Sequence, residues 1–169
     1  MTRVLVRGAG DVGSAVAHTL FARDHRVVIH DDPRPSHSRR GMSFTDALYC
    51  GKAELDGVLA KHARTVPDLA MMVECGRAIP MIDLALESAL SALRPNVLVD
   101  ARMRKHYPSD PQRGLAPLTI GLGPTFEAGR TIDVVVETAW GDRLGDVITS
   151  GRTSELAWMI PRTAPRCAK

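Results

Sequence analysis

The sequence predicts an α/β protein with a doubly wound, mostly parallel sheet covered by helices in three αβα layers. Short apolar runs that end in glycine or a charged residue recur along the 169-residue chain, and segments of helical spacing separate several of them. The runs show little polar–apolar alternation, which indicates strands buried on both faces. We therefore expect one domain over residues 1–150, large enough for a sizeable core, followed by a tail at 151–169 with little periodicity.

The first thirty residues carry the clearest alternation of elements. Apolar runs at 3–8 and 26–30 predict two strands, and the spacing of apolar residues over 11–22 predicts a helix between them. A G-x-G-x-x-G run from Gly8 to Gly13 joins the first strand to the helix. This order is typical of a Rossmann-like nucleotide-binding domain.

Later elements are less regular. The sequence predicts a short helix from Ser43 to Gly51, and a longer helix from Leu84 to Leu93 that Asp83 caps. Further strands are expected at 54–60, 69–73, 97–99, 115–122 and 132–137.

The glycine run has a specific chemistry in a dinucleotide-binding fold. Gly8 would make the turn, Gly10 would let the backbone approach a pyrophosphate, and Gly13 would allow the helix to pack closely on the strand. Asp11 and Val12 begin the helix, whose N-terminal N–H groups attract phosphate. The alternative for these residues is a plain strand-to-helix turn without a ligand.

Two acids follow the second strand. Asp31 comes eighteen residues after Gly13, where a carboxylate would bind the ribose hydroxyls, and Asp32 is its neighbour in that role. Asp31 favours NAD over NADP, because a carboxylate repels a 2′-phosphate. Arg39 and Arg40 form a candidate anion site that leaves NADP open, so the expected cofactor is NAD(P).

Two later strands end in candidate ligand-binding residues. Asp100 and Arg102 follow one strand, and Gly121 and Gly123 lie at the end of the next. Ligands in open α/β sheets bind beyond the carboxyl ends of the strands, so these four residues are expected to line the crevice. The alternative is that Asp100 pairs with Arg102 and that the glycines serve a turn.

Composition narrows the class of partner. The formal net charge is +3 and arginine supplies most of the cations, which favours a small anionic, nucleotide-like ligand. Aromatic residues make up only 4% of the chain, so a nucleic-acid partner is not expected. No apolar run has the length of a membrane helix and no leader is evident, so we expect no membrane contact and a cytoplasmic location.

Cysteine and histidine give no reaction centre. The chain has no C-x-x-C pair, so no metal site is expected, and Cys50 and Cys75 are predicted to be small core residues. His106 and Lys105 lie in a loop with no assigned partner, so the catalytic residues stay unknown. Association of identical copies is also left open.

Five sequence blocks, in order, resemble a known family: RGAGDVGSAVAHTLF, SRRGMSFTDALYCG, RPNVLVDARMRKH, IGLGPTFEAGRTIDVVVET and GDRLGDVI. They are similar to the Rossmann-type maturation proteins of selenium-dependent molybdenum hydroxylases, relatives of the xanthine dehydrogenase accessory proteins, over about residues 3–148. The chain departs from this pattern at Trp140 and Asp142, where the family tends to have polar and basic residues and a histidine. The family's second half has no counterpart in these 169 residues.

The resemblance implies a nucleotide-binding accessory protein that prepares a molybdenum hydroxylase, with that enzyme as partner and the molybdenum cofactor as a second candidate ligand. The competing function is a small NAD(P)-dependent oxidoreductase. By position, the resemblance carries its functional residues to Gly8, Gly10, Asp11, Arg39, Arg40, Asp100, Arg102, Gly121, Gly123 and Phe126.

Overall fold

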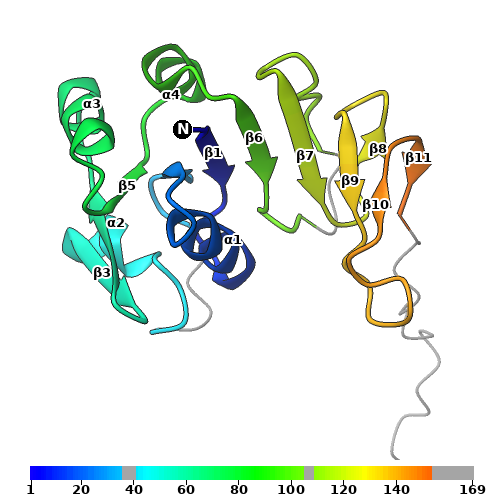
Figure 1. The fold of residues 1–169 in the computed structure, drawn as a ribbon, viewed down its shortest axis with the longest axis horizontal. Helices are drawn as coiled ribbons and strands as arrows, with labels where there is room; N and C mark the ends of the chain where they lie inside the picture. The colour runs from blue at the N-terminus through cyan, green and yellow to red at the C-terminus, as the bar shows by residue number, and fades with distance from the viewer. Residues whose placement is uncertain (36–40, 105–108, 154–169) are drawn as a thin grey trace, which may run out of the picture.

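The structure, a computed structural model, describes residues 1–35, 41–104 and 109–153, and it contains a nine-stranded sheet (Figure 1). The strand order is β10-β9-β7-β6-β1-β2-β5-β4-β3, and only the β3–β4 and β9–β10 pairs are antiparallel. The chain winds outward from β1 in one direction and then, from β6, in the other. This confirms the doubly wound α/β fold.

The bounds of the helices and strands are as follows. The sheet consists of β1 (Arg3–Arg7), β2 (Arg26–His30), β3 (Lys52–Leu55), β4 (Val58–His62), β5 (Ile79–Ile82), β6 (Val97–Asp100), β7 (Leu118–Leu122), β9 (Val134–Val136) and β10 (Val147–Ile148). The described helices are α1 (Asp11–Phe21), α2 (Asp46–Cys50), α3 (Val66–Cys75) and α4 (Leu86–Leu93), and a separate antiparallel pair joins β8 (Glu127–Ala128) to β11 (Gly151–Arg152).

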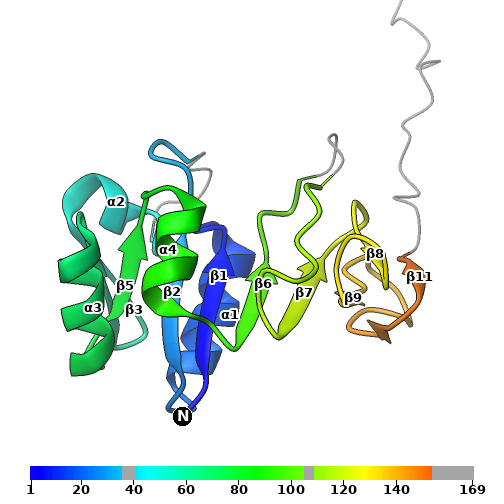
Figure 2. The same cartoon turned by 90° about the horizontal axis from the view of Figure 1, so that it is seen from above.

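Helices cover both faces of the sheet around its centre. Val4 and Val6 point toward α1 and α2, where they pack with Ala17 and Phe44. Leu5 points the other way and packs with the apolar residues of α3 and α4. Figure 2 shows α1 and α4 on opposite sides of β1. Each strand is therefore apolar on both faces, as the uninterrupted runs in the sequence predicted.

The far end of the sheet is covered differently. No described helix lies over β7, β9 and β10; the β8–β11 pair lies beside them instead (Figure 1). Phe126, Ala128, Ile132 and Val135 form a small separate core there. In the part of the chain that the structure describes, the three αβα layers thus do not extend over β7, β9 and β10.

The predicted strand at 54–60 is wrong, because the segment contains a hairpin. Asp56 and Gly57 both have positive φ, 45° and 77°, and they turn the chain between β3 and β4. The Asp-Gly pair is a strong hairpin signal that the strand prediction overlooked.

The predicted strand at 69–73 is also wrong, since it lies inside α3. Thr65 begins this helix by accepting a hydrogen bond on its side chain, and Leu69 and Val73 form its buried stripe. A four-residue spacing of apolar residues fits a helix better than a strand.

Smaller corrections concern helix starts and cysteines. The helix predicted from Leu84 begins at Leu86, and Asp83 Oδ1 lies within hydrogen-bond distance of His62 Nε2, at 3.0 Å, instead of capping the helix. Cys50 and Cys75 are exposed at the ends of α2 and α3, so the prediction that they are core residues is wrong. The strands expected at 97–99, 115–122 and 132–137 are present with shifted bounds, as β6, β7 and β9. Of the predicted tail, residues 154–169 lie outside the described part of the chain.

Candidate functional site

The glycine run lies at the carboxyl end of β1, where the strand order reverses between β1 and β6. Gly8 has a φ of +108°, and a Cβ there would lie 2.9 Å from the carbonyl oxygen of Ala101 and 2.9 Å from the amide nitrogen of Arg102. Both the backbone conformation and the lack of space therefore require glycine at position 8.

The other two glycines differ from each other in their surroundings. A Cβ on Gly13 would lie 2.0 Å from the carbonyl oxygen of Gly8, so α1 can approach β1 only because residue 13 has no side chain. A Cβ on Gly10 would meet nothing within 4 Å. Position 10 therefore borders open space, which is where a phosphate would contact the backbone of a dinucleotide-binding loop.

The carboxylate of Asp11, the first residue of α1, lies at the N-terminus of that helix. Gly10 provides no side-chain cap, and the Asp11 carboxylate accepts a hydrogen bond of 3.1 Å from the Val12 amide. A phosphate at this helix end would have to compete with Asp11 for that amide, although the helix dipole favours the anion.

Asp31 faces the glycine loop from the end of β2. Its carboxylate accepts hydrogen bonds from the amides of Ala9, at 2.6 Å, and Asp32, at 2.8 Å. Asp32 forms an ion pair of 3.6 Å with Arg104, which follows β6. The structure thus brings Asp31 and the glycine loop into direct contact, whereas Asp32 lies apart from them and is mostly exposed.

A buried hydroxyl network fixes the loop from behind, and the sequence analysis missed it. The carbonyl oxygen of Ala9 accepts hydrogen bonds from Ser14, at 2.9 Å, and from Thr45, at 2.7 Å. Ser43 donates to the Thr45 hydroxyl at 3.0 Å, and Ser14 also accepts from the Phe44 amide. Serine within the small-residue stretch of α1 was the one local signal for this contact.

Asp100 is the centre of a buried ionic cluster. The Arg102 guanidinium donates to both carboxylate oxygens at 2.6–3.1 Å, and the Gln112 amide donates at 2.5 Å. Burial alone would raise the pKa of Asp100, but these hydrogen bonds and the charge of Arg102 outweigh it and lower the pKa. The pairing of Asp100 with Arg102, one of the two alternatives from the sequence, is therefore present.

Gly121 and Gly123 have different roles in the end of β7. A Cβ on Gly121 would lie 2.5 Å from the ring of Phe126, so that ring fills the space beside the glycine. Gly123 has a φ of +100°, and its nearest neighbours are Thr138 and Met103 at 3.6 Å or more. Packing accounts for Gly121, and backbone conformation accounts for Gly123.

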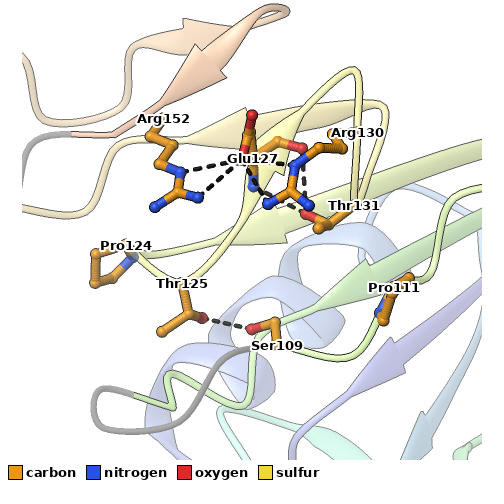
Figure 3. A pocket seen from close by; sticks show the side chains of 8 residues that line it. All are labelled: Ser109, Pro111, Pro124, Thr125, Glu127, Arg130, Thr131 and Arg152. Carbon is orange, nitrogen blue, oxygen red and sulfur yellow. Dashed lines mark hydrogen bonds and ion pairs between the residues drawn. The ribbon is translucent and has the colours of Figure 1, made fainter.

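A cavity of about 360 Å³ lies beyond the end of β7 (Figure 3). Arg130 and Arg152 flank Glu127 on one side of it, and each donates to the Glu127 carboxylate. On the other side, the hydroxyls of Ser109 and Thr125 lie 2.5 Å apart. Its arginines are about two-thirds exposed and already paired, so the cavity offers a polar surface without a free buried charge.

Several predicted residues lie outside the described ranges, namely Arg39, Arg40, Lys105 and His106. Among the described residues, no group of histidine, cysteine and acidic side chains could hold a metal ion. None of the described helices has the length and apolar character needed to cross a bilayer.

Comparison with known proteins finds a similar protein in Escherichia coli. The chain is 36% identical over 152 residues to a protein of Escherichia coli K12 described as "Uncharacterized protein YqeB". The match covers 90% of this chain but only 28% of the length of that relative. No family model and no solved structure matches the chain.

Proposed function

We propose that this chain binds a nucleotide of the NAD(P) type at the glycine loop. The observation that carries the proposal is the contrast among the three glycines, in which positions 8 and 13 are closed by backbone contacts while position 10 borders open space. A turn that served only packing would need the first and third glycine but not the second.

The acid at the end of β2 supports NAD over NADP. Asp31 already accepts the Ala9 amide, and its carboxylate lies beside the loop that would hold the pyrophosphate. A ribose diol can donate to a carboxylate, whereas a 2′-phosphate would be repelled by it. A phosphate-bearing molybdenum cofactor is a second candidate, because the same loop chemistry would accept its phosphate.

The biological role that we propose is maturation of a molybdenum hydroxylase. The support is the resemblance of the ordered sequence blocks, together with the state of two titratable groups next to the glycine loop: Asp31 accepts backbone amides, and the His30 side chain lies on the face of the sheet opposite α1. An oxidoreductase needs an acid or base held next to the nicotinamide. Asp100 is buried and forms an ion pair with Arg102, which makes it poorly suited to proton transfer.

A ligand screen with a turnover control tests this proposal. Thermal shifts should be measured with NAD, NADP, mononucleotides and molybdopterin, and any NAD(P)H turnover should be followed with common alcohols and hydroxy acids. We expect stabilisation by a nucleotide without turnover. Steady turnover of a defined small substrate would decide for the oxidoreductase.

The maturation role needs a test in cells. The variant should be Gly10→Val and not a substitution of Arg102, because removal of Arg102 would leave Asp100 without its ion-pair partner and destabilise the protein for an unrelated reason. We expect the Gly10→Val protein to accumulate normally but to leave a partner hydroxylase inactive. Full hydroxylase activity in cells that carry only this variant would contradict the proposed role.

A further inference from the structure

Three polar side chains lie in a row across the carboxyl ends of β6, β1 and β2. Arg7 is paired in register with Asp100 on one side and with His30 on the other. Residues two positions apart in a strand share a face, so these side chains point to the face that Leu5 covers, away from α1. Arg7 and His30 are each 7% exposed and Asp100 is 1% exposed.

This row, together with the Gln112 side chain that binds Asp100, contains polar atoms that have no hydrogen-bond partner in the described part of the chain. They are Arg7 Nε, His30 Nδ1 and the Oε1 of Gln112, whose amide group binds Asp100. Buried polar atoms are almost always paired, and each one left unpaired costs about 1–3 kcal/mol. Three such atoms on neighbouring residues indicate that a further group completes the cluster.

The charge of the cluster indicates the sign of that group. The side chains of Arg7 and Arg102 are 9% and 8% exposed, whereas Asp100 is the only buried acid that faces them among the described residues. Arg7 Nη1 lies 3.8 Å from Asp100 Oδ2, too far for a hydrogen bond, because Arg102 occupies that carboxylate. Burial and the charge of Arg102 lower the pKa of the Arg7 guanidinium, as expected for a cation that lacks sufficient compensation.

Asp31, partly buried, follows His30 at this edge, and the remaining charged groups, Asp110, Arg104 and Asp32, are partly or largely exposed. Asp110 lies 3.8 Å from Arg102 with a largely exposed carboxylate. Arg104 and Asp32 pair with each other at 3.6 Å and join the loops that follow the two strands flanking β1. An exposed pair of this kind contributes at most about 1 kcal/mol, so it can open at little cost when a ligand enters.

His30 also limits which group can complete the cluster, because its free ring nitrogen needs a hydrogen-bond donor. His30 Nε2 lies 2.9 Å from the carbonyl oxygen of Leu84, which can only accept a hydrogen bond, so Nε2 carries the proton. Nδ1 is then an acceptor that requires a donor. Arg7 Nε–H requires an acceptor. An oxyanion that also carries a hydroxyl proton satisfies both.

We propose that Arg7 and His30 form a second anion site, distinct from the glycine loop, that binds a protonated phosphate group. Arg7 supplies the charge and the donor, and His30 accepts the phosphate hydroxyl. The Asp100–Arg102 ion pair acts on Arg7 indirectly: Arg102 occupies the Asp100 carboxylate, so Arg7 is not paired with that acid at hydrogen-bond distance. The phosphate can be a free ion or part of a larger ligand.

A phosphate titration followed by NMR tests the site directly. Inorganic phosphate is added to the ¹⁵N-labelled chain at constant ionic strength, and the Arg7 Nε–H resonance is followed. We expect a saturable shift there, with Arg3 at the exposed start of the same strand as an internal control. Sulfate, which carries no proton at neutral pH, should bind more weakly than phosphate. An Arg7 resonance that phosphate does not move would overturn the proposal, and equal binding of sulfate would overturn the role of His30.

Two substitutions of Arg7 test whether this residue binds phosphate or only stabilises the fold. Arg7→Lys keeps the charge but lacks the Nε donor, and we expect it to weaken phosphate binding, read from the His30 ring resonances, about tenfold or more. Arg7→Met should not lower the melting temperature of the ligand-free protein, since it removes an undercompensated buried cation. A large loss of melting temperature would indicate a structural role instead.

The glycine loop and the Arg7–His30 site can be tested independently of each other. Gly10→Val should leave the phosphate shift at Arg7 intact while it weakens NAD binding about a hundredfold. If NAD does not bind the wild type but phosphate still shifts the Arg7 resonance, the proposed function is wrong and the second anion site is supported. A phosphate response confined to the amides of Ala9–Val12 would support the glycine loop and refute the second site.

Discussion

The substitution Gly10→Val separates ligand binding from folding at the glycine loop. A Cβ at position 10 meets nothing within 4 Å, and Gly10 has a φ of −65°, which any residue adopts. Valine is a poor N-cap residue, but it also reduces the freedom of the unfolded chain, and these effects offset each other. We expect the free energy of unfolding to change by about 1 kcal/mol or less.

The same side chain should block the ligand. It would stand between the loop amides and the pyrophosphate, and would remove about two charge-assisted hydrogen bonds of roughly 1.5–3 kcal/mol each. A loss of about 3 kcal/mol corresponds to a Kd that is about a hundredfold higher. Isothermal titration calorimetry with NAD measures the Kd, and urea unfolding measures the stability.

Two control variants complete the design. Ala15→Val adds a similar side chain on the exposed face of α1 and should leave NAD binding unchanged. Gly13→Ala would place its Cβ 2.0 Å from the Gly8 carbonyl oxygen and should cost about 3 kcal/mol of stability or more. Undiminished NAD binding by a folded Gly10→Val protein would refute the argument from open space.

Three further substitutions test neighbouring parts of the site. Asp31→Ala should weaken NAD by about 1.5–3 kcal/mol in calorimetry, and a wild-type preference for NADP would contradict this role of Asp31. Asp100→Asn should destabilise the protein by about 3–5 kcal/mol at neutral pH, because Arg102 loses its buried partner. Folding lowers the pKa of Asp100, so the ionised carboxylate stabilises the folded protein above about pH 4, and this stabilisation is lost as the pH falls further. The urea midpoints of the variant and the wild type should therefore converge in acid, and midpoints that stay apart would contradict this. Thr45→Val should cost about 1–3 kcal/mol in urea unfolding by removing a buried donor to Ala9, and an unchanged midpoint would count against the hydroxyl network.

The local sequence predicted the first half of the sheet well. The strand, glycine loop and helix of residues 3–21 are governed by neighbouring residues, because periodicity and glycine placement act within a few positions. The hairpin at Asp56 and Gly57 and the helix at 66–75 were missed. Residues 69–73 form a short continuous apolar run, which periodicity alone cannot assign to a strand or a helix, so the turn and cap signals were the better guide.

The site was predicted in part, and the missing residues are those that depend on long-range contacts. Asp31 and the glycines follow from the order of elements, which puts the ends of β1 and β2 side by side. Gln112 and Thr45 contact the site from segments distant in sequence, so no local pattern marks them. No sequence pattern marks Arg7 as a site residue, since its incomplete pairing depends on how Arg102 occupies the Asp100 carboxylate.

A crystal structure of the chain grown with NAD tests the central claim most directly. The account predicts density for the pyrophosphate against the Gly10 backbone and the start of α1, with the adenosine ribose hydroxyls within hydrogen-bond distance of Asp31. Density for NAD only in the cavity between Ser109 and Arg152, or no bound nucleotide at saturating concentration, would contradict it.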